Sequence, residues 1–319
     1  ANTALGVSTL RNHTEGNLNT AIGSVALRAN TTGEANTALG SSALYNNTTG
    51  NSNTAVGVGS LISNTTGRYN IAIGTSALNF NTTGEYNIAV GIGSLYNNVD
   101  GDNNTALGRD ALRNSTISNL TAVGFEALKE NTTGTENTAV GSSALTANTT
   151  GAVNTAVGEL ALFSNSTGQR NTALGASTLA NNTTASGNTA IGARALSQNT
   201  AQWNTAVGSL ALTFNTTGVN NTAIGRSVLS NNTEGIQNTA VGTNALTANI
   251  SGGNNTAIGA IALSRNTTGS RNAAFCAGAL FLNVSGANNS AIGTQALRSN
   301  TTGFENTAEG YDELFTNNT

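Results

Sequence analysis

The sequence predicts an all-β protein, a parallel β-solenoid of about nineteen coils. A 17-residue repeat, Asn-Thr-Ala-(Val/Ile/Leu)-Gly-x-x-Ala-Leu-x-x-Asn-Thr-Thr-Gly-x-x, runs through the whole chain. Seventeen residues are too few for a helical-hairpin repeat, which needs about 33. The Thr-Ala-Val tract is too short, and too soon followed by Gly, for a helix. Each repeat therefore suits one coil of stacked β-structure.

We number the repeat positions 1 to 17, starting from the Asn that precedes Thr-Ala. Nineteen rows follow one another with no linker, and one residue is missing before Thr121 and another before Thr205. Residues 1–319 are therefore expected to form a single solenoid domain, a segment of a longer fibre. The position-2 residues that mark the rows are Thr3, Thr20, Thr37, Thr54, Ile71, Ile88, Thr105, Thr121, Thr138, Thr155, Thr172, Thr189, Thr205, Thr222, Thr239, Thr256, Ala273, Ser290 and Thr307.

Each coil is expected to contain a short strand at positions 1–4, a turn at the position-5 Gly, a second short segment around Ala-Leu, and a second turn at Asn-Thr-Thr-Gly. Position 9 is Leu in every row, and position 4 is branched aliphatic except for Phe275 and Glu309. We expect both positions to point into the interior and to stack on their equivalents in adjacent coils. Position 3 is Ala throughout, which indicates a close approach by either a second wall of the coil or a partner chain.

The composition excludes several classes of protein. Charged residues make up 8% of the chain, against about 25% in an ordinary globular protein, and the net charge is -3. Without a basic face the chain is not expected to bind nucleic acid or an anionic membrane surface. No apolar run approaches the length of about 18 residues that spans a bilayer. The regular placement of the 37% hydrophobic residues argues against disorder.

Few residues are candidates for catalysis or metal binding. His13 is the only histidine and Cys276 the only cysteine, which excludes multi-histidine metal sites and an internal disulfide. Asp100 and Asp102 lack the recurring pattern of calcium-binding β-rolls. Trp203, in a shortened row, is expected to cover an irregularity in the coil. We therefore expect no catalytic or metal-binding residues, no cofactor, and no enzymatic activity.

The Asn-Thr-Thr turn also forms the acceptor sequence for N-linked glycosylation. The alternative is a bare turn, because Asn and Thr both favour turns. In the rows where Glu15 and Glu234 would destroy the acceptor, an Asn one place earlier, Asn12 or Asn231, restores it. This displacement favours covalent N-linked glycans, one per coil. The predicted sites are Asn12, Asn30, Asn47, Asn64, Asn81, Asn114, Asn131, Asn148, Asn165, Asn182, Asn215, Asn231, Asn249, Asn266, Asn283 and Asn300.

The repeat resembles the head repeats of YadA-like trimeric autotransporter adhesins. Their short Asn-Ser-x-Ala-Ile-Gly motif is echoed at Asn19–Gly23, Asn188–Gly192 and Asn289–Gly293. The rows are also similar to repeat tracts in phage tail-fibre shafts. This resemblance implies a left-handed parallel β-roll, often trimeric, that is displayed at a surface as an adhesive or spacer element.

Two functions of different classes remain open. The first is a structural shaft of an extracellular fibre or adhesin on a cell or virion surface, whose copies associate end to end or as a homotrimer. Open sheet edges at the coil ends favour end-to-end stacking. The second is a repeat surface that binds polysaccharide or ice through ranks of identical side chains, such as the position-2 Thr. Against ice binding, that Thr shares a strand face with the aliphatic residue that we expect to be buried.

Overall fold

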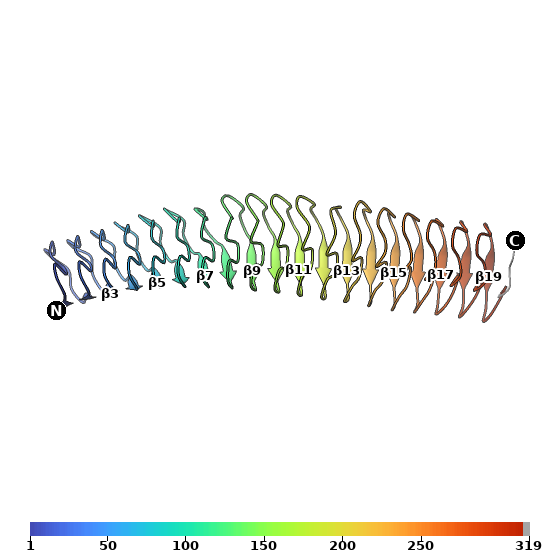
Figure 1. Ribbon diagram of the computed structural model, residues 1–319, viewed down its shortest axis with the longest axis horizontal. Helices are drawn as coiled ribbons and strands as arrows, with labels where there is room; N and C mark the ends of the chain where they lie inside the picture. The colour runs from blue at the N-terminus through green and yellow to red at the C-terminus, as the bar shows by residue number, and fades with distance from the viewer. Residues whose placement is uncertain (315–319) are drawn as a thin grey trace. The chain divides into compact units, whose positions relative to one another are not determined.

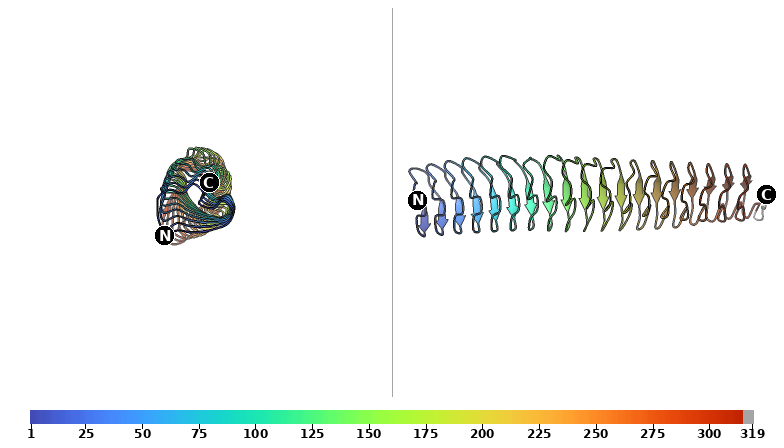
Figure 2. Two further views of the ribbon diagram at one scale, coloured as in Figure 1. Left: turned by 90° about the vertical axis from the view of Figure 1, so that its left-hand side faces the viewer. Right: turned by 45° about the horizontal axis from the view of Figure 1, so that its top comes forward.

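The computed structural model describes residues 1–314, which form a parallel β-solenoid with no helical residue in that range. The chain groups into two compact units, Ala1–Ala156 and Val157–Thr319. Within each unit, every repeat adds one three-residue strand to the stack (Figure 1, Figure 2). The strands are β1 (Thr3–Leu5), β2 (Thr20–Ile22), β3 (Thr37–Leu39), β4 (Thr54–Val56), β5 (Ile71–Ile73), β6 (Ile88–Val90), β7 (Thr105–Leu107), β8 (Thr121–Val123), β9 (Thr138–Val140), β10 (Thr155–Val157), β11 (Thr172–Leu174), β12 (Thr189–Ile191), β13 (Thr205–Val207), β14 (Thr222–Ile224), β15 (Thr239–Val241), β16 (Thr256–Ile258), β17 (Ala273–Phe275), β18 (Ser290–Ile292) and β19 (Thr307–Glu309).

Successive strands pair in parallel, with identical repeat positions opposite one another. This register holds from β1 to β9 in the first unit and from β11 to β19 in the second. The two 16-residue rows keep it, because Thr105 pairs with Thr121 and Thr189 with Thr205. The predicted rows and their two breaks are confirmed.

Residues in the left-handed region turn the chain between strands. Positions 7, 9 and 17 have positive φ in coil after coil, as at Val25 (53°), Leu27 (51°) and Ala35 (55°). A side chain other than Gly costs about 1–2 kcal/mol in this region, so hydrogen bonds between coils must hold it there. Val25 N donates to Val7 O of the preceding coil (2.8 Å), and Leu27 N to Ala43 O of the next (3.0 Å). The expected second short segment is therefore a series of turns.

The glycine at position 5 is required by both its conformation and its surroundings. At Gly40, φ is +141° and an added Cβ would lie 2.5 Å from the carbonyl oxygen of Gly57 in the next coil. Cys276 takes this position in a single row, with φ of 89° and an exposed free thiol. The stacked turns therefore approach one another by backbone contact.

The interior holds the leucine of position 9 and the alanine of position 3. Leu44 and Ala38 are both fully buried, so the prediction for the leucine is confirmed. Since the alanine is covered within a single chain, the close approach comes from the coil's own second wall.

The prediction that the position-4 aliphatic residues fill the interior is wrong. Strand alternation places Ala at position 3 inside, so positions 2 and 4 face outward. The leucine of position 9 and, in most coils, two asparagines already occupy the interior, which leaves room at position 3 for a methyl group. The aliphatic position-4 residues that are at least 36% exposed are Leu5, Leu39, Ile73, Leu107, Leu174, Ile224, Ile258 and Ile292.

Two leucines of β3 and its coil test this arrangement. Leu44→Ala should reduce the free energy of unfolding by about 2–5 kcal/mol, because it leaves a cavity in a fully buried site. Leu39→Ala, at a side chain 45% exposed, should change it by no more than about 0.5 kcal/mol. Urea unfolding and hydrogen exchange of the surrounding amides measure both effects. Equal losses in the two variants would contradict the assignment of inner and outer faces.

Candidate functional site

Two columns of asparagine run through the interior of each unit, and in most coils they meet at one carbonyl. Within residues 1–314 the columns are interrupted at His13, Ser115 and Leu120. Asn36, at position 1, and Asn47, at position 12, both donate from Nδ2 to Gly50 O, at 2.8 and 3.0 Å. Asn47 Nδ2 also donates to Asn30 Oδ1 of the preceding coil, at 2.9 Å. Asn53 N donates to Asn36 Oδ1, at 3.0 Å. We call these two columns the asparagine ladders.

The asparagine ladders include most of the predicted glycosylation sites, which corrects that prediction. An N-linked glycan is attached through Nδ2, and here that atom donates to a turn carbonyl inside the coil. A sugar at these positions cannot coexist with the fold, because the side chains are completely enclosed. The predicted sites that are buried in this way are Asn30, Asn47, Asn64, Asn81, Asn131, Asn148, Asn165, Asn182, Asn215, Asn249, Asn266, Asn283 and Asn300.

Three predicted sites lie outside the ladders. Asn12 and Asn231 are exposed. Asn114 is partly buried, and its Nδ2 donates to Glu130 Oε2 at 2.8 Å. Each of these asparagines stands at position 11, one residue before the buried position 12. Its side chain therefore lies outside the ladder. Glycosylation stays a prediction for these three residues only.

Three rows in which the position-12 asparagine does not begin a sequon show what this position requires. Asn98, Asn199 and Asn232 have no hydroxyl residue two places on, yet all three are fully buried and donate to turn carbonyls. The amide is therefore retained where the sequon is lost. The structural role of the asparagine explains the regularity that the sequence analysis attributed to glycans.

His13 occupies position 12 of the first coil in place of an asparagine. Its Nε2 lies 3.1 Å from Gly16 O, and its Nδ1 lies 3.3 Å from Asn30 Nδ2. The imidazole thus stands where the amide nitrogen and oxygen lie in the other coils. The single histidine of the chain takes part in the interior ladder.

A second regular feature is the outer strand face, which we define as the outward side chains of positions 2 and 4. Position 2 carries Thr, Ile, Ala or Ser, and position 4 carries an aliphatic residue, Phe275 or Glu309. Glu309 is thus the one charge on this face among residues 1–314. The sequence signal for the face was the unvarying Ala at position 3, which marks the side of the strand that is enclosed.

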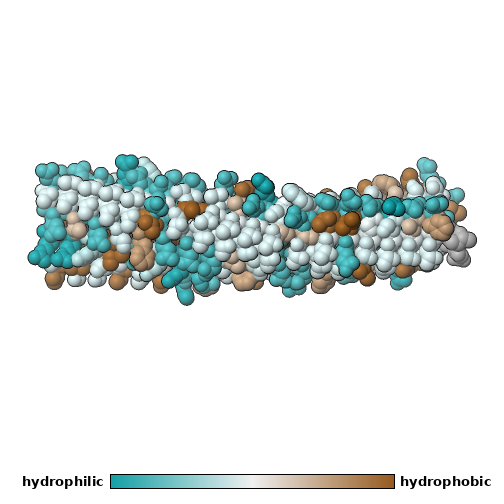
Figure 3. Space-filling view, turned by 90° about the horizontal axis from the view of Figure 1, so that it is seen from above, coloured by the Kyte–Doolittle hydropathy of each residue, from teal (hydrophilic) through white to brown (hydrophobic). Residues whose placement is uncertain are grey.

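On the side of the molecule drawn in Figure 3, scattered apolar side chains lie between hydrophilic ones. The Arg68 guanidinium forms an ion pair with Glu85, with Nε 2.8 Å from Oε1. The hydrogen bond to Glu85 raises the pKa of Arg68. Trp203 lies against Gly187, where a Cβ would come within 2.4 Å of the indole ring.

The described residues 1–314 contain no group of three His, Cys, Asp or Glu side chains that could hold a metal ion. Asp102 accepts a hydrogen bond from the backbone N–H of Glu85, at 2.7 Å, and so takes part in the coil stacking. Over the same range no helix is long and apolar enough to cross a membrane.

No protein-family model matches the sequence, and no curated protein shows significant similarity to it.

Adjacent asparagines provide a matched test of the asparagine ladders. Asn47→Asp replaces two donated hydrogen bonds with a buried carboxylate beside Asn30 Oδ1 and Gly50 O. We expect a loss of about 3 kcal/mol in the free energy of unfolding at neutral pH. Asn46→Asp, at the exposed neighbour, should have little effect.

The pH dependence separates loss of the amide from burial of charge. Burial raises the pKa of the new carboxyl in the folded state, so the folded protein binds a proton more tightly than the unfolded chain. The Asn47→Asp deficit should shrink as pH falls from about 8 towards about 4. Denaturant midpoints across this range measure it. A deficit that does not change with pH would contradict burial of the carboxylate.

Proposed function

We propose that the chain is the shaft of an extracellular fibre or adhesin, and that its copies associate through the outer strand face. The observation that carries this proposal is the column of outward aliphatic side chains in parallel register, in which Glu309 is the one charged residue among residues 1–314. Soluble monomers ordinarily interrupt such surfaces with charged residues.

The first unit illustrates the apolar character of this face. In β5 both outward residues are isoleucines, with Ile71 38% and Ile73 40% exposed. Ile88 of β6 pairs with Ile71 and is 37% exposed. Burying these side chains would stabilise an assembly by about 25 cal/mol per Å² of apolar surface removed from water. The occupant we propose is a second copy of the chain, because its strands repeat at the same spacing of about 4.8 Å and match the face coil for coil.

The interior suits a shaft. Each coil bonds only to its neighbours, so stability accumulates with the number of coils and does not need a large hydrophobic core. Surface display and homotrimer formation follow the resemblance to adhesin heads. The exposed Asn12 and Asn231 are then the positions where an exported fibre could carry glycans.

Charge on the outer strand face tests self-association. The triple variant Leu39→Lys, Val56→Lys, Ile73→Lys should shift the protein towards monomer in sedimentation velocity, because a lysine column cannot pack against its own copy. The control places three lysines in the turns of the same coils. It consists of Thr49→Lys, Thr66→Lys and Thr83→Lys, all at exposed side chains. A wild-type protein that stays monomeric at high concentration, or a control that dissociates equally, would contradict the proposal.

Ice binding is the second candidate. The position-2 Thr and the position-4 aliphatic residue both face outward, as in Thr54 and Val56 of β4, so the objection raised from the sequence does not hold. Regular Thr ranks on a flat, uncharged sheet are what such a surface requires.

If this face binds ice, the wild-type protein should lower the freezing point below the melting point and shape growing crystals. Both effects should be lost in the Leu39, Val56 and Ile73 lysine variant and retained in the turn variant. Freezing-point hysteresis measured under a microscope checks this. Absence of hysteresis in the wild type would eliminate the candidate.

A further inference from the structure

A groove with a volume of about 560 Å³ lies on the second unit, away from the outer strand face. It crosses four successive coils and is formed by side chains of positions 7, 10 and 11. Its volume falls within the range of about 300–1,000 Å³ found for small-molecule sites. Four coils at about 4.8 Å spacing give it a length of about 14 Å, which suits a short chain of rings. The lining residues used below are Ser177, Arg194, Ser197, Gln198, Phe214 and Ser230.

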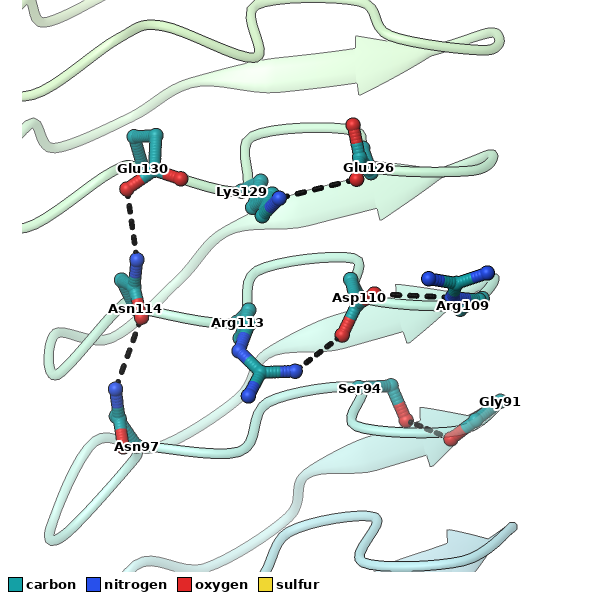
Figure 4. Close-up of polar contacts among 10 residues, drawn as sticks. All are labelled: Gly91, Ser94, Asn97, Arg109, Asp110, Arg113, Asn114, Glu126, Lys129 and Glu130. Atoms are coloured by element: carbon teal, nitrogen blue, oxygen red, sulfur yellow. Dashed lines mark hydrogen bonds and ion pairs between the residues drawn. The ribbon is translucent and has the colours of Figure 1, made fainter.

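In two neighbouring coils of the first unit, the same positions carry larger side chains that form ion pairs. Figure 4 shows Arg113 directed at Asp110 and Lys129 directed at Glu126, the latter pair at 3.0 Å. Asn114 bridges neighbouring coils in the same view, accepting a hydrogen bond from Asn97 at 2.9 Å. The groove lies where position 10 carries a small residue in four successive coils, namely Ala180, Ser197, Thr213 and Ser230.

Ser197 places an unused hydroxyl in the floor of the groove. Its side chain is 7% exposed, and its Oγ makes no hydrogen bond with the protein. Thr213, at the same position of the next coil, is equally buried but donates to Leu210 O at 2.8 Å. The Ser197 hydroxyl is therefore free to donate a hydrogen bond to a ligand in the groove and to accept one from it.

Arg194 provides an unpaired positive charge on the groove. Its side chain is exposed, and within residues 1–314 no carboxylate lies close enough to form an ion pair with it. A guanidinium binds a carboxylate through two parallel hydrogen bonds. An acidic group on a ligand would therefore be held here.

The rest of the lining suits a sugar. Asn181 Nδ2 donates to Gln198 Oε1 at 2.7 Å, which leaves the Gln198 amide nitrogen free to donate to a hydroxyl. Phe214 is 52% exposed and offers an apolar ring to the hydrophobic face of a sugar. Ser177 and Ser230 add hydroxyl groups at either end.

The backbone around the groove argues against a peptide ligand. An extended peptide usually binds by pairing its main chain with a free strand edge. Here the N–H groups of Ser177, Arg194 and Gln198 donate to carbonyls of adjacent coils, at 2.8, 3.0 and 3.0 Å. Recognition must therefore come from side chains.

We infer that this groove binds an acidic oligosaccharide, with Arg194 on the carboxylate, Ser197 and Gln198 on hydroxyl groups, and Phe214 against a ring face. This site lies apart from the outer strand face and does not depend on the proposed self-association.

The test uses trisaccharides that contain galacturonate, glucuronate or N-acetylneuraminate, each paired with its methyl ester, which keeps the rings and removes the charge. Titration calorimetry with the full chain should show at least one acid binding with sub-millimolar Kd. Its ester should bind at least tenfold more weakly.

Variants then locate the site. Arg194→Gln and Phe214→Ala, both at exposed side chains, should each weaken binding at least tenfold, and the nearly isosteric Ser197→Ala should weaken it several-fold. Arg170→Gln, at an exposed arginine outside the groove, should leave Kd unchanged. Circular dichroism of each variant checks that it is folded. Failure of every acid to bind, equal binding of acid and ester, or insensitivity to Arg194→Gln and Phe214→Ala would overturn the inference.

Discussion

The fold depends on hydrogen bonds between asparagine amides and one turn carbonyl inside the coil, which belongs to a glycine in most coils and to Ala185 in one. Gly50 O receives amides from the beginning and from the second turn of its own coil, so one acceptor links distant parts of the 17-residue loop. A Cβ at Gly50 would lie 2.4 Å from Asn47 Oδ1, which explains why the carbonyl belongs to a glycine. The amide oxygens bond in turn to the adjacent coil. The interior of the solenoid is therefore ordered by directional contacts as much as by burial of leucine.

The sequence predicted the coils well because their period is explicit in it. The strands, the parallel register and the two shortened rows follow from counting, and Leu44 is buried as a strictly repeated leucine should be. The direction of Leu39 could not be obtained in the same way. Alternation separates the two faces of a strand but does not say which face is enclosed. The small alanine at position 3 is the better choice for the interior only because the asparagine side chains also occupy that space.

The asparagines themselves were open to two interpretations from sequence. Asn-Thr-Thr is both a turn and a glycan acceptor, and periodicity supports either. The distinguishing residues were Asn98 and Asn199, which keep the amide and lose the acceptor. The groove beside Arg194 was not predicted, because it arises where the variable position 10 happens to be small in four successive rows. The repeat positions with a constant type of residue thus form the interior and the outer strand face. The variable positions form features that occur in only a few coils, such as the groove.

The parallel register also bears on how such a chain can change over evolutionary time. Two coils have each lost one residue, yet Thr105 still lies opposite Thr121 and Thr189 opposite Thr205. In the first of them Asn104 donates to Ile117 O, one residue earlier than usual, so the turn absorbs the loss. Whole repeats are interchangeable for the same reason, since each coil contacts only its neighbours. Unequal recombination between near-identical repeats in the gene would therefore lengthen or shorten the protein in steps of one coil, and every product would still present the same faces.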